Sequence, residues 1–197
     1  MFSQEVIYNY EYEYRSDIMQ RIQRCFHTGI KAHCKVFMVR LDVRFPLGFV
    51  HDGRNTVVSE LLRRLKANYT YHGVDCRYVW VREQNQSSLP HYHLLLLLDG
   101  SRIENGWGVR AIAGVLWCGL LDADCDACIH LCQPLHGGSG IMIRRPSSRS
   151  EGEKLHVEKA NCEAAYRAAV DWSSYLAKTH TKGEAPHGVR EWGSSRF

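Results

Sequence analysis

The sequence of 197 residues contains no long apolar run. None of its hydrophobic stretches approaches the roughly 20 residues that a helix needs to cross a bilayer, so we expect no membrane partner. The first residues are rich in tyrosine and carry Glu5, Glu11 and Glu13. They lack the basic region and the apolar stretch of a secretion signal, which predicts a cytoplasmic protein.

Two motifs that mark common functional classes are missing as well: a Gly-rich phosphate loop and a second C-x-x-C pair. The chain has no Gly-rich phosphate loop of the type G-x-x-x-x-G-K-[ST], so any helicase activity has to come from another chain. Eight cysteines are present, but only Cys125 and Cys128 form a C-x-x-C pair, with Cys132 nearby. We interpret these cysteines as reduced, buried thiols. Zinc binding by the cluster is the alternative.

The composition is that of a globular protein, with 45% hydrophobic and 23% charged residues. The net charge is +4, which is compatible with a polyanionic partner such as nucleic acid. Glutamates in the last third of the chain partly offset its basic residues, so a mixed, solvated surface is the alternative. Those basic residues include Arg144, Arg145, Arg149, Lys154, Lys159, Lys178, Lys182, Arg190 and Arg196.

The spacing of apolar residues predicts the secondary structure. Helices are expected over 14–31, 55–73, 103–121 and 160–178, with Ser16 as the N-cap of the first. Strands are expected over 35–45, 76–83 and 91–98, with shorter ones at 129–131 and 141–143. Residues from 183 onward have no strong pattern.

The order of these elements is a helix, then β-α-β-β-α-β, then a helix. This order predicts an α+β fold with a ferredoxin-like, or split β-α-β, antiparallel sheet. The first and third strands are expected side by side at the centre of that sheet. Helices would cover one face, and the other face would be free for a ligand or a further helix.

The strand over 91–98 carries the most informative residues. Its five consecutive leucines, between Pro90 and Gly100, predict a strand buried on both faces. His91 and His93 precede them, and residues i and i+2 of a strand point to the same side. Two such imidazoles can hold one metal ion, whereas the alternative is a pair of solvent-facing strand histidines.

A carboxylate near the two histidines would complete a metal site. Glu83 ends the neighbouring hairpin strand, and Gln84 and Asp99 are weaker candidates for the third ligand. A mixed nitrogen and oxygen site with open positions suits Mg²⁺ or Mn²⁺ bound to a phosphate.

Tyr175 and Lys178 lie three residues apart on the predicted last helix and therefore share a face. A tyrosine hydroxyl can attack a phosphodiester if its phenolate is stabilised, because the free phenol has a pKa of about 10. A neighbouring ammonium supplies such stabilisation. An ordinary amphipathic turn is the alternative for this pair taken alone.

As an ordered set, these elements resemble the HUH endonucleases. More closely, the chain is similar to the inovirus-type replication proteins and to the prophage YagK/YfjJ C-terminal-like family. The segments that carry the resemblance are 37–44 (FMVRLDVR), 81–84 (VREQ), 90–93 (PHYH) and 175–178 (YLAK). The resemblance implies a bacterial host cell and an HUH domain over 31–183, after an N-terminal extension and helix over 1–30 and before a tail over 184–197.

The resemblance also implies a mechanism. A replication initiator of this kind nicks single-stranded DNA at an origin, and His91, His93 and Glu83 would hold its divalent ion. Tyr175 would form a 5′-phosphotyrosine link with help from Lys178, and the released 3′-hydroxyl would prime a host polymerase for rolling-circle synthesis. A host helicase is a further expected partner.

DNA binding is expected to use the free sheet face and basic side chains. Arg40, Asp42 and Arg44 share a strand face and are expected to bind DNA, and the two arginines can contact phosphate or a base. Lys182 is expected to add positive charge. Three alternatives to the replication initiator stay open: a relaxase or single-strand transposase with the same chemistry, a non-catalytic nucleic-acid-binding module, and a small zinc-binding regulator.

Overall fold

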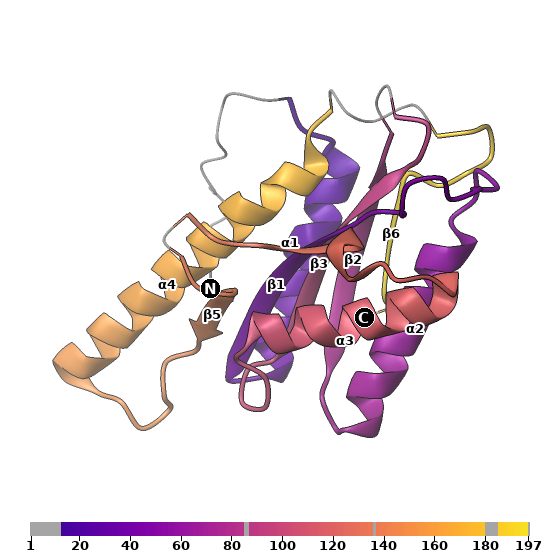
Figure 1. Cartoon of the computed structure of the whole chain (residues 1–197). Coiled ribbons are helices and arrows are strands. Elements are labelled where there is room, and N and C mark those ends of the chain that lie inside the picture. Colours follow the sequence, from indigo (N-terminus) through magenta and orange to yellow (C-terminus); the bar gives the residue numbers. More distant parts are fainter. Residues whose placement is uncertain (1–12, 85–86, 136, 180–184, 197) are drawn as a thin grey trace.

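The computed structural model describes residues 13–84, 87–135, 137–179 and 185–196. They form an α+β fold in which four α-helices pack on one open antiparallel sheet of six strands (Figure 1). The predicted α+β class is therefore confirmed. No helix among the described residues has both the length and the apolar character needed to cross a membrane.

The elements have the following bounds. The helices are α1 (Ser16–Ala32), α2 (Thr56–Tyr71), α3 (Gly106–Leu121) and α4 (Gly152–Ser174), with short 3₁₀ turns η1 (Asp126–Cys128) and η2 (Tyr175–Ala177). The strands are β1 (Lys35–Val43), β2 (Cys76–Glu83), β3 (His91–Asp99), β4 (Ile129–Cys132), β5 (Ile141–Arg144) and β6 (Trp192–Ser194).

Strands β1 and β3 form the centre of the sheet. The strand order is β4-β1-β3-β2-β6. Strand β4 pairs with the second half of β1, and β5 pairs with its first half. The leucines of β3 are buried on both faces, as predicted. Leu94, Leu96 and Leu98 belong to one hydrophobic core, whereas Leu95 and Leu97 belong to the other, because successive strand side chains point to opposite faces.

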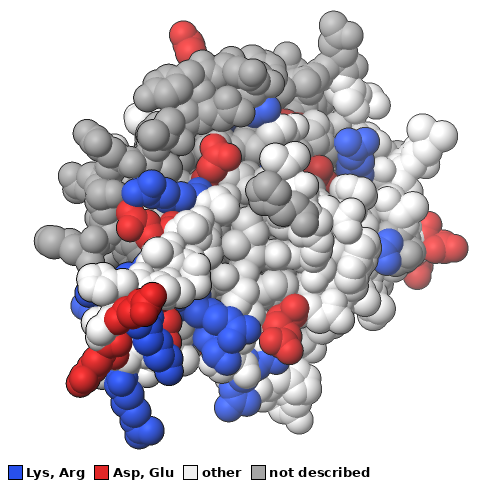
Figure 2. All heavy atoms as spheres, turned by 90° about the vertical axis from the view of Figure 1, so that its left-hand side faces the viewer, with Lys and Arg blue, Asp and Glu red and all other residues white. Residues whose placement is uncertain are grey.

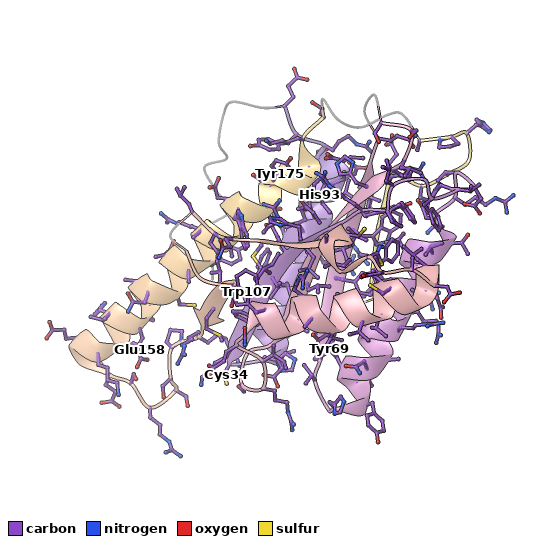
Figure 3. All side chains as sticks on the ribbon, viewed as in Figure 1. Cys34, Tyr69, His93, Trp107, Glu158 and Tyr175 are labelled. Atoms are coloured by element: carbon purple, nitrogen blue, oxygen red, sulfur yellow. The ribbon has the colours of Figure 1, made fainter. Side chains whose placement is uncertain are left out.

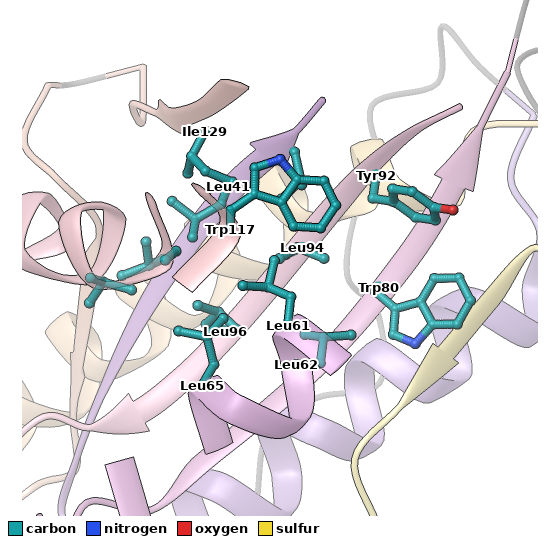
Figure 4. Close-up of a cluster of buried hydrophobic side chains, with 14 of the residues drawn as sticks. Leu41, Leu61, Leu62, Leu65, Trp80, Tyr92, Leu94, Leu96, Trp117 and Ile129 are labelled. Carbon is teal, nitrogen blue, oxygen red and sulfur yellow. The ribbon is translucent and has the colours of Figure 1, made fainter. Parts of the chain in front are cut away.

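Helices α2 and α3 cover the first face of the sheet. Figure 4 shows part of this core, in which Trp117 of α3 packs near Leu41 and Leu94 of the central strands. Trp117 is fully buried, and its indole nitrogen donates a hydrogen bond to the carbonyl oxygen of Arg44. The polar end of this large side chain is thus satisfied inside the core.

Helices α1 and α4 cover the second face, which the sequence left open to a ligand or a further helix. The buried residues of α1 include Ile18, Ile22 and Phe26, which pack with Val170 of α4 against this face. The predicted helical spacing of α1 is confirmed. A DNA strand therefore cannot lie across the middle of this face of the sheet.

Three local predictions are wrong. Arg15, not Ser16, is the N-cap of α1. Helix α4 begins at Gly152 rather than near residue 160, because its first turns are mostly exposed and polar and give no apolar period. The tail contains strand β6, which pairs with β2, and the main-chain nitrogen of Ser195 donates to the carbonyl of Tyr78 at 3.0 Å.

Candidate metal centre

Strands β2 and β3 bring three potential ligands together near the hairpin that joins them. Glu83 lies opposite His91 in the antiparallel register, and Val81 lies opposite His93. Each of Glu83, His91 and His93 offers a ligand atom, and these atoms lie within 4.8 Å of one another. Both imidazoles point to the α1 and α4 side of the sheet, the same side as Leu95.

Glu83 is the third candidate ligand that the structure places beside the histidines. Its Oε2 lies 3.0 Å from His93 Nε2 and 3.4 Å from His91 Nε2. The other candidates lie elsewhere. The Gln84 side chain accepts a hydrogen bond from Arg82, and Asp99 lies at the other end of β3 from His91.

Asp42 of β1 orients the imidazole of His93. The two residues are register partners, and the Asp42 carboxylate is hydrogen-bonded to His93 Nδ1. His93 Nε2 is then directed toward Glu83, where it is buried and makes no hydrogen bond of good geometry. A carboxylate on one ring nitrogen and an unsatisfied second nitrogen form a common arrangement around metal-binding histidines, so these residues fit a divalent cation.

The pKa values of His93 and of its partner Asp42 are both displaced from their ordinary values. Burial lowers the pKa of His93, but the two neighbouring carboxylates, Asp42 and Glu83, together outweigh burial, so the net shift is upward. Burial raises the pKa of Asp42, but the hydrogen bond and charge of His93, together with Cys132 and Arg40, outweigh burial, so the Asp42 pKa falls. The site therefore holds more negative charge than a neutral imidazole can balance, and a proton or a metal ion supplies the missing positive charge.

Tyr175 lies beside this cluster, although it comes from the far end of the chain. Figure 3 shows Tyr175 and His93 next to each other, and their ring centroids are 5.2 Å apart. The Tyr175 side chain is partly open to solvent, with 38% of the residue exposed. Its pKa is raised by burial and by the carboxylates of Glu83 and Asp42, and Arg40 opposes the shift.

The main chain fixes Tyr175 in this position. Helix α4 ends at Ser174, whose hydroxyl donates to the Asp171 carbonyl at 2.6 Å, and Tyr175 begins η2 instead of continuing the predicted α-helix. The carbonyl of Ala177 then accepts a hydrogen bond from the Arg15 nitrogen at 2.8 Å. The tyrosine therefore follows a helix end that is anchored to the segment before α1.

Two cations contact the Tyr175 ring. Lys178 Nζ lies 4.1 Å from the ring centroid, as the shared face of the pair predicts, and Arg40 Cζ lies 4.8 Å from it. Arg40 is 6% exposed, and its Nη1 donates to the Trp172 carbonyl. The structure thus places Arg40 inside the site, where it is able to act on the phenol, and not on an open sheet face.

The remaining predicted DNA-binding residues have different positions. Asp42 lies in the centre itself, as a partner of His93. Arg44 is exposed just after β1. Lys182 lies outside the described residues. Sequence reasoning assigned Arg40 and Asp42 to DNA because both share one strand face, and only the β1–β3 register reveals that this face points at the histidines.

The cysteine cluster has a different geometry. Cys125 is buried in the core under α3, and its thiol donates to the sulfur of Cys118 at 3.0 Å. Burial raises the pKa of Cys125 and of Cys132 to about 12 in each case. Within the described part of the chain, Glu83, His91 and His93 form a metal-competent group, and no group with a cysteine meets the same condition.

Comparison with known proteins identifies one family. The model of the YagK/YfjJ C-terminal domain matches residues 1–106, more than half of the chain, and this range contains Glu83, His91 and His93 but not Tyr175. No curated protein and no solved structure matches. The chain belongs to the YagK/YfjJ C-terminal domain family.

Proposed function

We propose that this protein is a metal-dependent HUH endonuclease that nicks and rejoins single-stranded DNA at an origin of rolling-circle replication. One observation carries the proposal: Tyr175 lies against His93 of the Glu83–His91–His93 cluster, although it is far away in the sequence. A lone histidine pair or a lone tyrosine would have structural explanations. A partly exposed tyrosine beside a metal-competent cluster is the arrangement that phosphodiester transfer needs.

The topology supports the same proposal. The strand order β4-β1-β3-β2 is that of a split β-α-β sheet, and α2 and α3 pack on one face of it. In the ferredoxin-like HUH topology that we propose, the histidine strand is central and a helix after the sheet leads to the tyrosine. Strand β3 and the α4–η2 segment would correspond to these two elements.

Glu83, His91 and His93 would hold Mg²⁺ or Mn²⁺, and the bound ion would polarise the scissile phosphate. Asp42 keeps the His93 ring in the orientation that leaves Nε2 available for the ion. Because Glu83 and His93 are each about 3% exposed, the ligand atoms are held in a rigid, largely buried setting.

Tyr175 would then supply the nucleophile. Its Oη forms a bond to phosphorus, the bond from phosphorus to the 3′ oxygen breaks, and the phenol proton is balanced by the proton that the leaving 3′ oxygen takes up. Lys178 and Arg40 place two positive charges at the ring, which favours the phenolate against the raised pKa of the resting tyrosine. The reverse transfer rejoins the strand.

The partners follow from this chemistry. The released 3′-hydroxyl is a primer for a host DNA polymerase, and strand separation would require a separate helicase. A relaxase or a single-strand transposase performs the same transfer at a different DNA site. Cleavage assays on origin and transfer sequences distinguish these roles.

The test is whether the protein forms a covalent adduct with single-stranded DNA. The protein is incubated with single-stranded circular DNA and Mn²⁺, and a denaturing gel is examined for a slow-migrating protein–DNA species. We expect an adduct that Tyr175→Phe abolishes, without loss of DNA binding. Tyr71→Phe, which changes an exposed tyrosine on α2, is the matched control and should retain the adduct.

Two outcomes would contradict the proposal. An adduct that persists in Tyr175→Phe would exclude this nucleophile. DNA binding without any adduct, under conditions in which Mn²⁺ is bound, would instead favour a non-catalytic nucleic-acid-binding module.

A further inference from the structure

A cavity of about 780 Å³ lies at the opposite end of the molecule from Tyr175. It is lined by the start of β1, the end of β5, the loop that follows β5, and α4. Figure 3 places Cys34 and Glu158, which line this cavity, far from the neighbouring labels of Tyr175 and His93. Its volume falls in the usual range for ligand pockets.

Three cations converge on this cavity. Lys35 and Arg144 are direct partners across the β1–β5 pair, and Arg145 follows, with its main-chain nitrogen bonded to the Cys34 carbonyl at 2.8 Å. Like charges directly opposite each other destabilise an antiparallel pair. Among the residues that the structure describes, none of the three forms an ion pair, so an anion from outside would relieve their repulsion.

The other polar residues of the cavity are hydrogen-bond donors or already have partners. Ser147, Ser148 and Asn161 offer hydroxyl and amide groups. Glu158 is the one carboxylate among the described residues of the lining, and its Oε2 accepts a hydrogen bond from the Ser147 nitrogen at 2.9 Å. That backbone bond holds the pKa of Glu158 below its usual value. This carboxylate of α4 therefore stays ionised against the loop, and the three cations leave the described lining with a positive balance.

The lining indicates which anion fits. Arginine, lysine, serine and asparagine are the side chains that contact phosphate in nucleic-acid complexes. Among the described residues, no aromatic side chain lines the cavity, so this lining lacks the stacking surface that binds bases. The chemistry matches phosphate groups rather than nucleobases.

The surface around the cavity has mixed charge. Figure 2 looks onto the side of the molecule that carries α4 and β5, and Lys and Arg side chains gather in its lower part beside several Asp and Glu side chains. The overall charge of this side therefore does not select an anion. The selectivity arises from the three convergent cations of the cavity.

We propose that Lys35, Arg144 and Arg145 form a phosphate-binding pocket that takes the backbone of a single DNA strand, at a distance from the metal centre. The phosphate chemistry stands on the pocket itself, and the choice of a DNA strand rests on the proposed endonuclease function. Helix α4 connects the two sites: from Glu158, which lines the pocket, to Ser174, which precedes Tyr175, it spans roughly 24 Å. At about 3.4 Å per phosphate, a stacked strand of about seven nucleotides would reach from one to the other.

The test measures DNA affinity without cleavage. Fluorescence anisotropy with a single-stranded 20-mer, in the presence of a chelator, is recorded over a range of salt concentrations. We expect the double variant Arg144→Gln, Arg145→Gln to lower the affinity about tenfold or more. The slope of log affinity against log salt should fall by about 1.4, since each phosphate contact on single strands contributes about 0.7.

Matched controls separate the pocket from charge alone. The double variant Arg63→Gln, Arg64→Gln removes the same charge from α2, where both arginines pair with Glu60, and should leave affinity and slope close to the wild type. Arg144→Lys, Arg145→Lys retains the charge and should retain most of the binding. Equal losses in the two glutamine variants, or no loss in either, would overturn the proposal.

A second arm identifies the source of the phosphate. Inorganic phosphate and thymidine monophosphate are titrated by calorimetry into the wild type and into the Arg144→Gln, Arg145→Gln variant. Tight, saturable binding of either compound that the variant loses would assign the pocket to a small phosphate compound and refute the DNA strand.

The two proposals can fail separately. If the covalent adduct is never formed but the 20-mer still depends on Arg144 and Arg145, the endonuclease is refuted and the pocket stands. If the adduct forms and the glutamine variant binds like the wild type, the pocket is refuted and the endonuclease stands.

Discussion

The imidazole of His93 has a different neighbour at each ring nitrogen. Asp42 is hydrogen-bonded to Nδ1, and Glu83 lies 3.0 Å from Nε2 without a well-formed hydrogen bond. His93 is only 3% exposed, so water does not substitute for either neighbour. In the proposed metal site, Asp42 would orient the ring and Nε2 would be the ligand atom, and both roles can be tested with single substitutions.

Asp42→Asn should weaken Mn²⁺ binding by about 10- to 100-fold, which is the usual effect of removing a carboxylate that supports a metal-binding histidine. The amide keeps the shape of the side chain but not the charge that stabilises the His93 ring. Calorimetric titration with Mn²⁺ measures the change. Asp99→Asn removes a carboxylate from the other end of β3 and should bind like the wild type; equal weakening in both variants would refute the role of Asp42.

The pH dependence of stability provides a second test in the metal-free protein. The pKa of His93 is raised from 6.5, so its contribution is complete below pH 6.5 and is lost as the pH rises through the folded-state value. The pKa of Asp42 is lowered from 3.8, so its contribution is complete above pH 3.8 and is lost as the pH falls through the folded-state value. The pair therefore stabilises the fold most between these two limits.

Urea unfolding of His93→Gln in the presence of a chelator checks this window. The substitution should destabilise the protein more at about pH 5 than at about pH 8.5. His27→Gln changes an exposed histidine of α1 and serves as the control, with a smaller effect of pH. A destabilisation by His93→Gln that does not vary with pH would contradict the assignment.

At the scale of elements, the strongest sequence patterns gave the correct structure. Strand β2 has the predicted bounds, and the five leucines of β3 are buried on both faces, because a continuous apolar run allows few other structures. Helix α4 and strand β6 were misjudged for the opposite reason. The first turns of α4 are solvated, and β6 is held by main-chain hydrogen bonds to β2, which leave no apolar pattern.

Some residues of the candidate site were predictable from local sequence patterns, and others were not. Glu83, His91 and His93 were predictable because they adjoin one hairpin and need only strand alternation. The roles of Asp42 and Arg40 were not predictable. They depend on the register between β1 and β3 and on the end of α4, which are long-range features that no local pattern encodes.

Two glycines on different elements should respond in opposite directions to the same substitution. A Cβ on Gly193 of β6 would lie 2.7 Å from the indole nitrogen of Trp80, so Gly193→Ala should destabilise the protein by about 1–3 kcal/mol. Gly108 of α3 has open space around it, and Gly108→Ala should stabilise by up to about 1 kcal/mol because alanine favours the helix. Thermal unfolding measures both changes; a Gly193→Ala variant as stable as the wild type would show that Gly193 does not lie against Trp80 as described.

At the scale of the whole molecule, the candidate metal centre joins segments that are distant in sequence. Glu83 and His91 belong to the hairpin, Asp42 to β1, and Tyr175 to the segment after α4. The tail adds to this connection, since Arg15 pairs with Glu191 at 2.8 Å beside the start of α1. A ligand that binds this centre binds only the folded chain, and its binding energy therefore stabilises the fold as a whole.

Mn²⁺ should accordingly raise the unfolding temperature. At a concentration of 100 times its Kd, the ion should add about 2.7 kcal/mol, which corresponds to roughly 5–10 °C for a chain of this size. His91→Ala should lose this gain without severe damage to the core, because the His91 side chain is 22% exposed. His27→Ala, on the surface of α1, should keep the gain. If Mn²⁺ stabilises His91→Ala as much as the wild type, the ion binds elsewhere and the metal centre is refuted.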